Sequence, residues 1–306
     1  MKGLFRIGTR GSKLALWQAG FISQLVTAEF PEIRTEIEVI KTTGDVNLES
    51  PLAEIGGKGV FVKEIEEALI ADRIDAAVHS LKDLPAALPE GLLIGAYAKR
   101  HDPRDALLSN RGLKLAELPP GSAVGTGSLR RAAQILHAYP ELRIKPIRGN
   151  VDTRIRKLRE SGDYDAIVLA AAGLERMGMT GEASEILPVD TVLPAPGQGI
   201  VAVECRAGDE NSLQVLSAVD YAASRYMAVA ERGFLSALSG DCNVPAGAYS
   251  EVDGGRIEIR ALIASPDGKK IVSGGSSGKT DDSDSIGRAL ARSMLRNGGG
   301  ASMSSF

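Results

Sequence analysis

Five arginines occupy turns rich in glycine, serine, threonine or asparagine, each beside an apolar run typical of a β-strand. A guanidinium presents a fixed fork of donors that matches carboxylate or phosphate oxygens two at a time. Arginines that serve only solubility would lie mostly on polar helix faces. The sequence therefore predicts a site for a ligand with several anionic groups, formed by Arg10, Arg130, Arg131, Arg148 and Arg154.

The turn at residues 125–131 has the clearest anion-binding chemistry. It follows an apolar strand, opens a helix, and combines free backbone N–H groups with two arginines and the hydroxyls of Thr126 and Ser128. Anions favour helix N-termini. The spacing matches neither a P-loop nor a dinucleotide fingerprint, which argues against ATP and NAD. The alternative is a helix start whose arginines face water. The turns at 148–154 and 9–12 also place an arginine among small polar residues after a strand-like run, which makes this alternative less favoured.

A second cluster closes the strand-like run at residues 75–80. Asp83 and Lys82 follow its carboxyl end, where open α/β sheets bind their ligands, so Asp83 is the best candidate for a catalytic carboxylate. The alternative for Asp83 is a cap before Pro85. His79 is more often a core or supporting histidine than a proton carrier. In the glycine-rich segment 55–61, Lys58 is a candidate anion contact, and a plain flexible loop is the alternative.

The two cysteines have different surroundings. Cys205 ends an apolar strand and is expected in the core, whereas Cys242 lies in a loop among Gly, Pro and polar residues. That loop favours a nucleophile or a covalent attachment point for Cys242 over an unreactive surface thiol. No cysteine or histidine spacing predicts a metal site.

Composition limits the class of protein. The chain has 306 residues, 43% hydrophobic and 4% aromatic, with a formal net charge of −3, which indicates a globular protein of two or three domains. The slight negative charge argues against a nucleic-acid-binding surface. The apolar stretches are too short for a membrane span, and the start resembles no secretion signal, so a cytoplasmic location without membrane partners is expected.

Strand-like and helical runs alternate in two blocks, which predicts α/β domains with parallel strands. The predicted strands are 5–8, 35–39, 76–78, 123–124, 144–147 and 166–171, and the helices between them are 13–29, 60–71, 129–138 and 153–161. After the Pro/Gly-rich residues 193–199, strand 200–204 is expected to return to the first sheet, so that two chain crossings make a hinge and a ligand cleft. Segments 256–263, 270–272 and 283–296 predict a small α+β third domain.

These motifs together resemble the porphobilinogen deaminase (hydroxymethylbilane synthase) family. The resemblance runs in order from about residue 6 to residue 250, and the last fifty residues add little to it. Its motifs are residues 9–12, 14–18, 56–61, 77–83, 125–131, 148–150, 196–199 and the loop of Cys242. Gly127 stands where the family often has serine, and Glu54 stands where some members have lysine. This chain therefore lacks one hydroxyl and one positive charge that other members have at these positions.

The resemblance implies an α/β fold with two doubly wound domains like those of periplasmic binding proteins and a small α+β domain. The division we predict is 1–98 with 198–215, then 99–197, then 216–306. The implied enzyme is a transferase of porphyrin and heme biosynthesis that joins four porphobilinogen molecules head to tail, releases ammonia at each step, and hydrolyses off a linear hydroxymethylbilane. One dipyrromethane per chain, held by a thioether to Cys242, is the implied primer.

The family resemblance also assigns roles by residue. Loss of ammonia would leave a methylene-pyrrole cation, and a carboxylate at about 4 Å from that charge is worth roughly 4 kcal/mol at an effective dielectric near 20, so Asp83 is catalytic. Phe61 would stack on a pyrrole or shield the cleft. The implied cofactor contacts are Lys82, Thr126, Ser128, Arg130, Arg131, Arg148 and Gly199, and the implied substrate contacts are Arg10, Ser12, Lys58, Phe61, Arg148, Arg154, Arg176 and Gln198.

The expected partners are porphobilinogen and the growing polypyrroles, with a hand-off of product to uroporphyrinogen III synthase. A monomer is expected. The alternative function is a non-enzymatic two-domain binding protein for a small polycarboxylate, which would not need Cys242. A thiol hydrolase or redox enzyme would need a histidine base, and no histidine is placed by sequence to serve Cys242.

Overall fold

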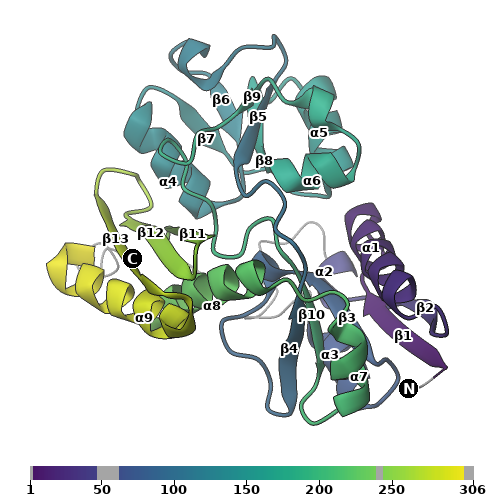
Figure 1. Cartoon of the computed structure of the whole chain (residues 1–306). Helices are drawn as coiled ribbons and strands as arrows, with labels where there is room; N and C mark the ends of the chain where they lie inside the picture. The colour runs from purple at the N-terminus through teal and green to yellow at the C-terminus, as the bar shows by residue number, and fades with distance from the viewer. Residues whose placement is uncertain (1–2, 47–61, 239–243, 300–306) are drawn as a thin grey trace. The chain divides into compact units, whose positions relative to one another are not determined.

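A computed structural model describes residues 3–46, 62–238 and 244–299 of the chain (Figure 1). The chain divides into two compact units. The first contains Met1–His101 and Ile200–Arg225, and the second contains Asp102–Gly199 and Tyr226–Phe306. Each unit is described by itself below.

The sheet of the first unit has the strand order β2-β1-β3-β10-β4. Strands β1, β2 and β3 are parallel, and β10 runs antiparallel to both of its neighbours. The expected return of the chain after residue 199 is therefore confirmed. The strands are β1 Leu4–Thr9, β2 Arg34–Val39, β3 Ala76–Ser80, β4 Leu92–Tyr97 and β10 Val201–Arg206.

The sheet of the second unit repeats this arrangement in the order β7-β6-β8-β5-β9. Its parallel strands are β6, β7 and β8, and β5 runs antiparallel to β8 and β9. In both sheets the fourth strand is the antiparallel one. The strands are β5 Asp105–Ser109, β6 Ala123–Gly125, β7 Arg143–Lys145, β8 Ala166–Ala170 and β9 Glu185–Ile186.

Helices cover both faces of each sheet. In β3, Val78 packs with α1 and α7 on one face, while Ala77 packs with α3 on the other. In the second sheet, α4 covers one face and α5 and α6 the opposite one. The predicted α/β class with two doubly wound sheets is confirmed. These helices are α1 Lys13–Glu29, α3 Lys63–Ile70, α4 Leu129–Ala138, α5 Val151–Glu160, α6 Ala171–Arg176 and α7 Glu210–Leu216.

A small antiparallel sheet, β11-β12-β13, forms the C-terminal α+β part of the chain, as predicted. Helices α8 and α9 pack on it around Phe234 and Ile259. Its elements are α8 Ala222–Ala237, β11 Ala246–Asp253, β12 Arg256–Ala264, β13 Ile271–Lys279 and α9 Ser283–Met294. The remaining short helical segments are α2 Thr43–Val46, η1 Leu81–Asp83, η2 Leu115–Glu117, η3 Thr180–Glu182, η4 Thr280–Asp282 and η5 Leu295–Gly299. The predicted three-domain boundaries stay a prediction.

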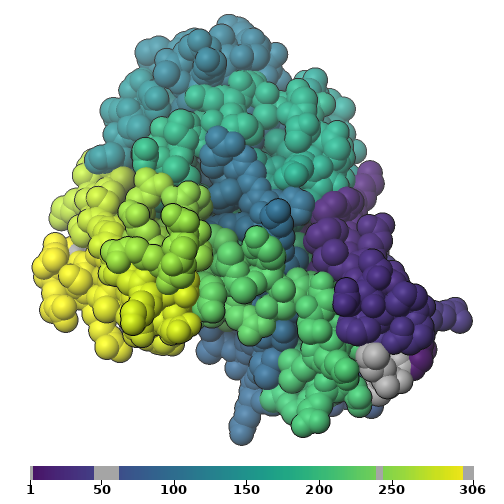
Figure 2. All heavy atoms as spheres, in the orientation of Figure 1, coloured from purple at the N-terminus to yellow at the C-terminus, as the bar shows by residue number. Residues whose placement is uncertain are grey.

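Within the second unit, this small sheet packs against α4 and the segment around Leu193, and Figure 2 shows the surfaces of both parts. Ala133 of α4 shares an apolar cluster with Leu193 and with Leu262 of β12. The Nδ1 atom of His137 lies 2.9 Å from the carbonyl oxygen of Gly268. The loop after β12 is thereby attached to the C-terminal end of α4.

Candidate active site

The turn before α4 forms a capped helix N-terminus. Thr126 Oγ1 accepts a hydrogen bond from the N–H of Ser128 at 3.1 Å, and Ser128 Oγ caps the helix by accepting from the N–H of Arg131 at 3.4 Å. A Cβ atom on Gly127 would lie 3.1 Å from the carbonyl oxygen of Ile147, so the turn is tight at that point. The helix therefore begins where the sequence predicted, with two arginines in its first turn.

Arg130 and Arg131 are both 6% exposed and share one buried carboxylate. Arg130 Nη1 lies 2.8 Å from Asp105 Oδ2 and donates to the carbonyl of Leu193 at 2.6 Å. Arg131 donates to Asp105 Oδ1 from Nε at 3.0 Å and from Nη2 at 2.7 Å. Asp105 itself begins β5 and is fully buried.

The charges of this group do not balance. Two guanidinium groups, which stay protonated in proteins, share one carboxylate, so one positive charge is left over among the described residues. Burial would raise the pKa of Asp105, but Arg130 and Arg131 outweigh burial and lower it. Burial also lowers the pKa of Arg130, because it disfavours the charged form. An anionic ligand group would compensate this excess charge.

Two more predicted arginines, both half-buried, lie at the start of α5: Arg148 in the turn before the helix and Arg154 in its first turn. Arg154 Nε donates to the carbonyl of Gly149 at 2.7 Å, and Lys157 Nζ donates to the carbonyl of Arg148 at 3.2 Å. Gly149 has a φ of 114°, a conformation that favours glycine. Asn150 caps α5 without a side-chain hydrogen bond. Arg148 and Arg154 are therefore less enclosed than the pair on α4.

Two predicted contacts, Arg176 and Gln198, are bound to the protein itself. Arg176 is 6% exposed, and its Nη2 donates to the carbonyl of Gly199 at 2.7 Å. Burial lowers the pKa of Arg176 to about 10. Gln198 is 1% exposed and donates from Nε2 to the carbonyl of Pro103 at 2.7 Å and to Asp105 Oδ1 at 2.9 Å. The sequence did not indicate these internal contacts.

In the first unit, the predicted catalytic carboxylate lies in η1, directly after β3. The N–H of Leu81 bonds to the carbonyl of Ile200 at 3.0 Å, and Gln18 donates to Ser80 Oγ at 2.8 Å, so the strand end is held in place. Asp83 is exposed, and within the described residues its side chain has no hydrogen-bond or ion-pair partner. It does not act as a helix cap. Lys82 is half-buried beside it.

The N-terminus of α1 carries the remaining pair of predicted contacts. Ser12 Oγ accepts from the N–H of Ala15 at 3.3 Å and caps the helix. Arg10 is half-buried between the end of β1 and this cap. Like the turns before α4 and α5, this one therefore combines an arginine with a helix N-terminus.

His79 and Cys205 have core positions. His79 is 5% exposed, and its Nε2 lies 2.9 Å from Oε2 of the fully buried Glu204. Cys205 is fully buried, and burial raises the pKa of its thiol to about 11. The core position expected for Cys205 is confirmed, and His79 lies in the core rather than at the strand end. Three predicted site residues, Lys58, Phe61 and Cys242, lie outside the described residues, as do Glu54 and the 55–61 segment.

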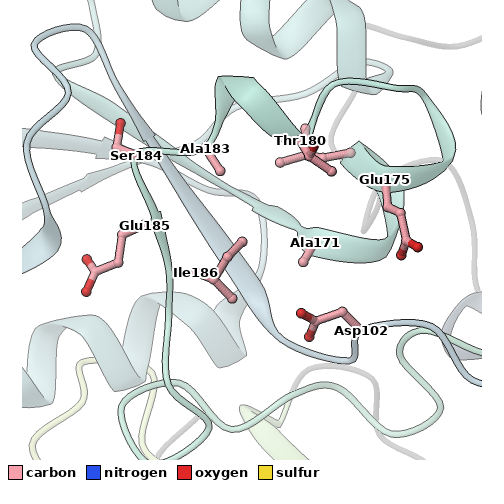
Figure 3. Close-up of a pocket in the computed structure, with 9 residues that line it drawn as sticks. Asp102, Ala171, Glu175, Thr180, Ala183, Ser184, Glu185 and Ile186 are labelled. Carbon is pink, nitrogen blue, oxygen red and sulfur yellow. The ribbon is translucent and has the colours of Figure 1, made fainter.

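A pocket of about 650 Å³ opens elsewhere in the second unit. Figure 3 shows the carboxylates of Asp102, Glu175 and Glu185 among its lining residues. None of the residues that line it carries a positive charge, and none was a predicted contact. An acidic pocket repels a polycarboxylate, so we do not assign the ligand to it. Across the described ranges, no group of three or more His, Cys, Asp or Glu residues is placed to hold a metal ion.

Asp105 and Glu231 are the principal residues that the sequence analysis missed. Both are fully buried, and Glu231 Oε2 accepts from the N–H of Gly197 at 2.6 Å. An aspartate that opens an apolar strand, as in the run Asp105–Ser109, was the signal that could have revealed the first. No local signal marks Glu231 on its helix.

In the part of the chain that the structure describes, no helix has the length and apolar character needed to cross a membrane. Among solved structures, the second substrate binding domain of a putative amino acid ABC transporter from Streptococcus pneumoniae aligns with a TM-score of 0.43 and 13% identity, over 70% of this chain and 91% of that one. A likeness of this size carries no argument.

Two family models match most of the chain: "Porphobilinogen deaminase, dipyromethane cofactor binding domain" over residues 5–214, and "Porphobilinogen deaminase, C-terminal domain" over residues 226–296. Porphobilinogen deaminase of Syntrophomonas wolfei is 49% identical over 296 residues, covering 97% of this chain and 96% of that protein. Porphobilinogen deaminase of Brevibacillus brevis is 49% identical over 299 residues, with the same coverage. The chain belongs to the porphobilinogen deaminase family.

Proposed function

We propose that the chain condenses four porphobilinogen molecules head to tail, with release of ammonia at each step, and then releases linear hydroxymethylbilane by hydrolysis. Family membership supports this tetrapyrrole-forming transferase activity over the binding-protein alternative. The observation that carries it in the structure is the pair of buried arginines that share Asp105. Porphobilinogen carries an acetate and a propionate, which are the anions that such a site requires.

The residues at α4 fit a dipyrromethane cofactor. The unbalanced positive charge on Arg130, Arg131 and Asp105 suits one of its carboxylates, and the first turn of α4 suits another. Cys242 is the residue that would hold the cofactor through a thioether. When bound, the dipyrromethane supplies the pyrrole carbon on which the chain of rings grows. Lys82, Thr126, Ser128, Arg148 and Gly199 complete the proposed cofactor contacts.

Substrate carboxylates would be bound by the less enclosed arginines. Arg10 follows β1, Arg148 precedes α5 and Arg154 lies in the first turn of α5, and all three are half-buried. A hydrogen bond to a charged group contributes about 1.5 to 3 kcal/mol. The remaining proposed substrate contacts are Ser12, Lys58, Phe61, Arg176 and Gln198. Gln198 and Arg176 act in part by holding the turn at residues 197–199.

Asp83 is the proposed catalytic residue. Its carboxylate is exposed at the end of β3, without a partner among the described residues that would neutralise it. It can therefore stabilise the positive charge that develops on the substrate when ammonia leaves. The same carboxylate would accept the proton that the pyrrole carbon loses after the new bond forms.

We further propose that the enzyme acts as a monomer in the cytoplasm and passes its product to uroporphyrinogen III synthase. Each unit is compact by itself, which suits a monomer. The hand-off follows from the chemistry of a linear tetrapyrrole with free ends, which needs a ring-closing enzyme.

Intact-mass measurement of the purified chain tests this function. The native chain should exceed its sequence mass by one dipyrromethane, and Cys242→Ser should remove that excess. Cys205→Ser is the matched control, because Cys205 is fully buried and should leave the added mass in place. A native chain that gains no mass even after porphobilinogen is added would contradict the proposal.

A further inference from the structure

Three consecutive residues of the Pro-Gly-Gln-Gly turn, residues 196–199, are each bound by a buried charged side chain. The N–H of Gly197 donates to Glu231 Oε2 at 2.6 Å, Gln198 Nε2 donates to Asp105 Oδ1 at 2.9 Å, and the carbonyl of Gly199 accepts from Arg176 Nη2 at 2.7 Å. Glu231 and Asp105 are fully buried, and Arg176 is 6% exposed. This turn is therefore firmly held, although its composition alone is typical of a loose hinge.

The first of these carboxylates connects the turn to the arginines of α4. Asp105 accepts from Gln198 and from Arg131 through the same oxygen, Oδ1, while its Oδ2 pairs with Arg130. Both guanidinium planes are thus oriented by one carboxylate, and that carboxylate is oriented by the turn. Losing it would leave two like charges buried side by side, which is costly.

The second carboxylate connects the turn to the C-terminal sheet. Glu231 lies on α8, and its Oε1 accepts from the N–H of Ser250 at 2.8 Å and from Ser250 Oγ at 2.7 Å. Ser250 belongs to β11. Helix α8 ends at Ala237, five residues before Cys242, and β11 begins at Ala246, four residues after it. Glu231 therefore fixes both elements that flank the segment containing Cys242.

We propose that Asp105 and Glu231 are positioning residues that hold the cofactor-binding arginines and the two elements flanking Cys242 on one turn. Neither touches the reacting atoms. Their effect is to hold the arginines of α4 and the facing parts of α8 and β11 in fixed positions around that turn. This inference rests on the proposed function, since it concerns the loading of dipyrromethane.

The test measures how fast the chain gains its dipyrromethane. Chains produced without porphobilinogen are mixed with porphobilinogen, and the gain of dipyrromethane mass is timed. Asp105→Asn and Glu231→Gln should each slow loading at least about tenfold, because a displacement near 1 Å at a binding group has effects of this size or larger. The double variant should be no slower than the slower single variant, since both changes release the same turn.

Glu231→Asp covers the case in which the neutral variants fail to fold. It keeps the charge and shortens the side chain by one methylene, so it moves the turn without placing an amide donor against the N–H groups of Gly197 and Ser250. We expect slower loading of a folded chain. Ile257→Val, which removes one methyl from the fully buried position in β12, is the control for lost stability and should load at the wild-type rate.

The outcomes separate the two proposals. Wild-type loading by Asp105→Asn, Glu231→Gln and Glu231→Asp would overturn the positioning role and leave the function intact. Equal slowing by Ile257→Val would also overturn it, because general loss of stability would then explain the result. If the wild-type chain itself gains no dipyrromethane, the proposed function fails.

Discussion

At the scale of single residues, burial divides arginines that look equivalent in the sequence. Arg130 and Arg131 are each 6% exposed, whereas Arg148, before α5, and Arg154, in its first turn, are half-buried. Turn composition predicted that arginines lie at strand ends, and the structure places them there. It could not predict which would be enclosed, because Asp105 and Leu193, their partners, are 25 or more residues away in the chain. Only the folded chain brings such partners together.

Asp83 gives the first prediction at this scale. Asp83→Ala should lower kcat by about three powers of ten, because a carboxylate about 4 Å from a developing positive charge is worth roughly 4 kcal/mol. Stability should change little, since the side chain is exposed. Single-turnover release of ammonia checks the rate, and a melting curve checks the fold. Replacing Glu90, an exposed carboxylate outside the site, should leave kcat unchanged. A loss below about tenfold for Asp83→Ala would contradict the catalytic role.

The buried carboxylate of Glu66 predicts a pH effect on stability. Glu66 on α3 is 7% exposed, and burial, followed by the charge of Glu204, raises its pKa from 4.5 to about 7, while His79 opposes this shift. A carboxyl with a raised folded-state pKa binds its proton more tightly in the folded chain. Its stabilisation is therefore complete below about pH 4.5 and is lost as the pH rises through 7.

Urea unfolding at pH 5, 6, 7 and 8 measures this effect. The free energy of unfolding of the wild type should fall over this range, and Glu66→Gln should flatten the fall and be the more stable chain at pH 8. Glu67→Gln is the matched control, because Glu67 is an exposed neighbour on the same helix that lies 3.9 Å from Lys63. Parallel pH curves for the wild type and Glu66→Gln would refute the prediction.

At the scale of elements, the regular helices and the parallel strands were the predictable part. Ser12 and Ser128 are the side-chain caps that directly precede α1 and α4, and the runs that form β3 and β8 are short, apolar and buried. The strands that sequence analysis missed are β4, β5, β9 and β11, and β11 begins with the small residues Ala246, Gly247 and Ala248. Gly95 interrupts β4, a buried charge opens β5, and β9 has only two residues, so none shows a clear two-residue period.

The crossing of α8 and α9 supplies a prediction about element packing. A Cβ atom on Gly287 would lie 1.9 Å from the carbonyl oxygen of Ala230, so Gly287→Ala should force the helices apart and cost about 1 to 3 kcal/mol or more. Gly20, inside α1, has nothing within 4 Å of such a Cβ. Gly20→Ala should therefore stabilise the chain by about 0.5 to 1 kcal/mol. Chemical denaturation of both variants gives the sign of each change in the free energy of unfolding. An unchanged free energy for Gly287→Ala would show that the helix crossing is not tight.

At the scale of the whole molecule, the two sheets have the same strand order and the same strand directions. Each takes its antiparallel fourth strand from the chain just after it has crossed from the other unit, as β5 follows residue 101 and β10 follows residue 199. The sequence predicted this for β10, because its apolar run follows a Pro/Gly-rich turn. The two α/β blocks were predicted, but their common strand order was not, because alternating runs do not show which strands pair.

The distribution of charge over the molecule predicts a weak salt dependence. The formal net charge is −3, so the long-range field does not attract an anionic substrate, and binding depends on arginines close to it. Of the arginines proposed to bind the substrate, Arg176 is 6% exposed and Arg10, Arg148 and Arg154 are half-buried, and salt screens buried or partly buried charges less than exposed ones. Between about 0.05 and 0.5 M NaCl, where the Debye length shrinks from above 10 Å to below 5 Å, kcat/KM for porphobilinogen should fall by less than about threefold.

Steady-state kinetics across this range at constant pH measures how kcat/KM depends on salt concentration, with KCl in place of NaCl as a control for specific ion effects. A fall of more than about tenfold would mean that exposed cations recruit the substrate, and the buried arginines would then act on the bound ligand alone.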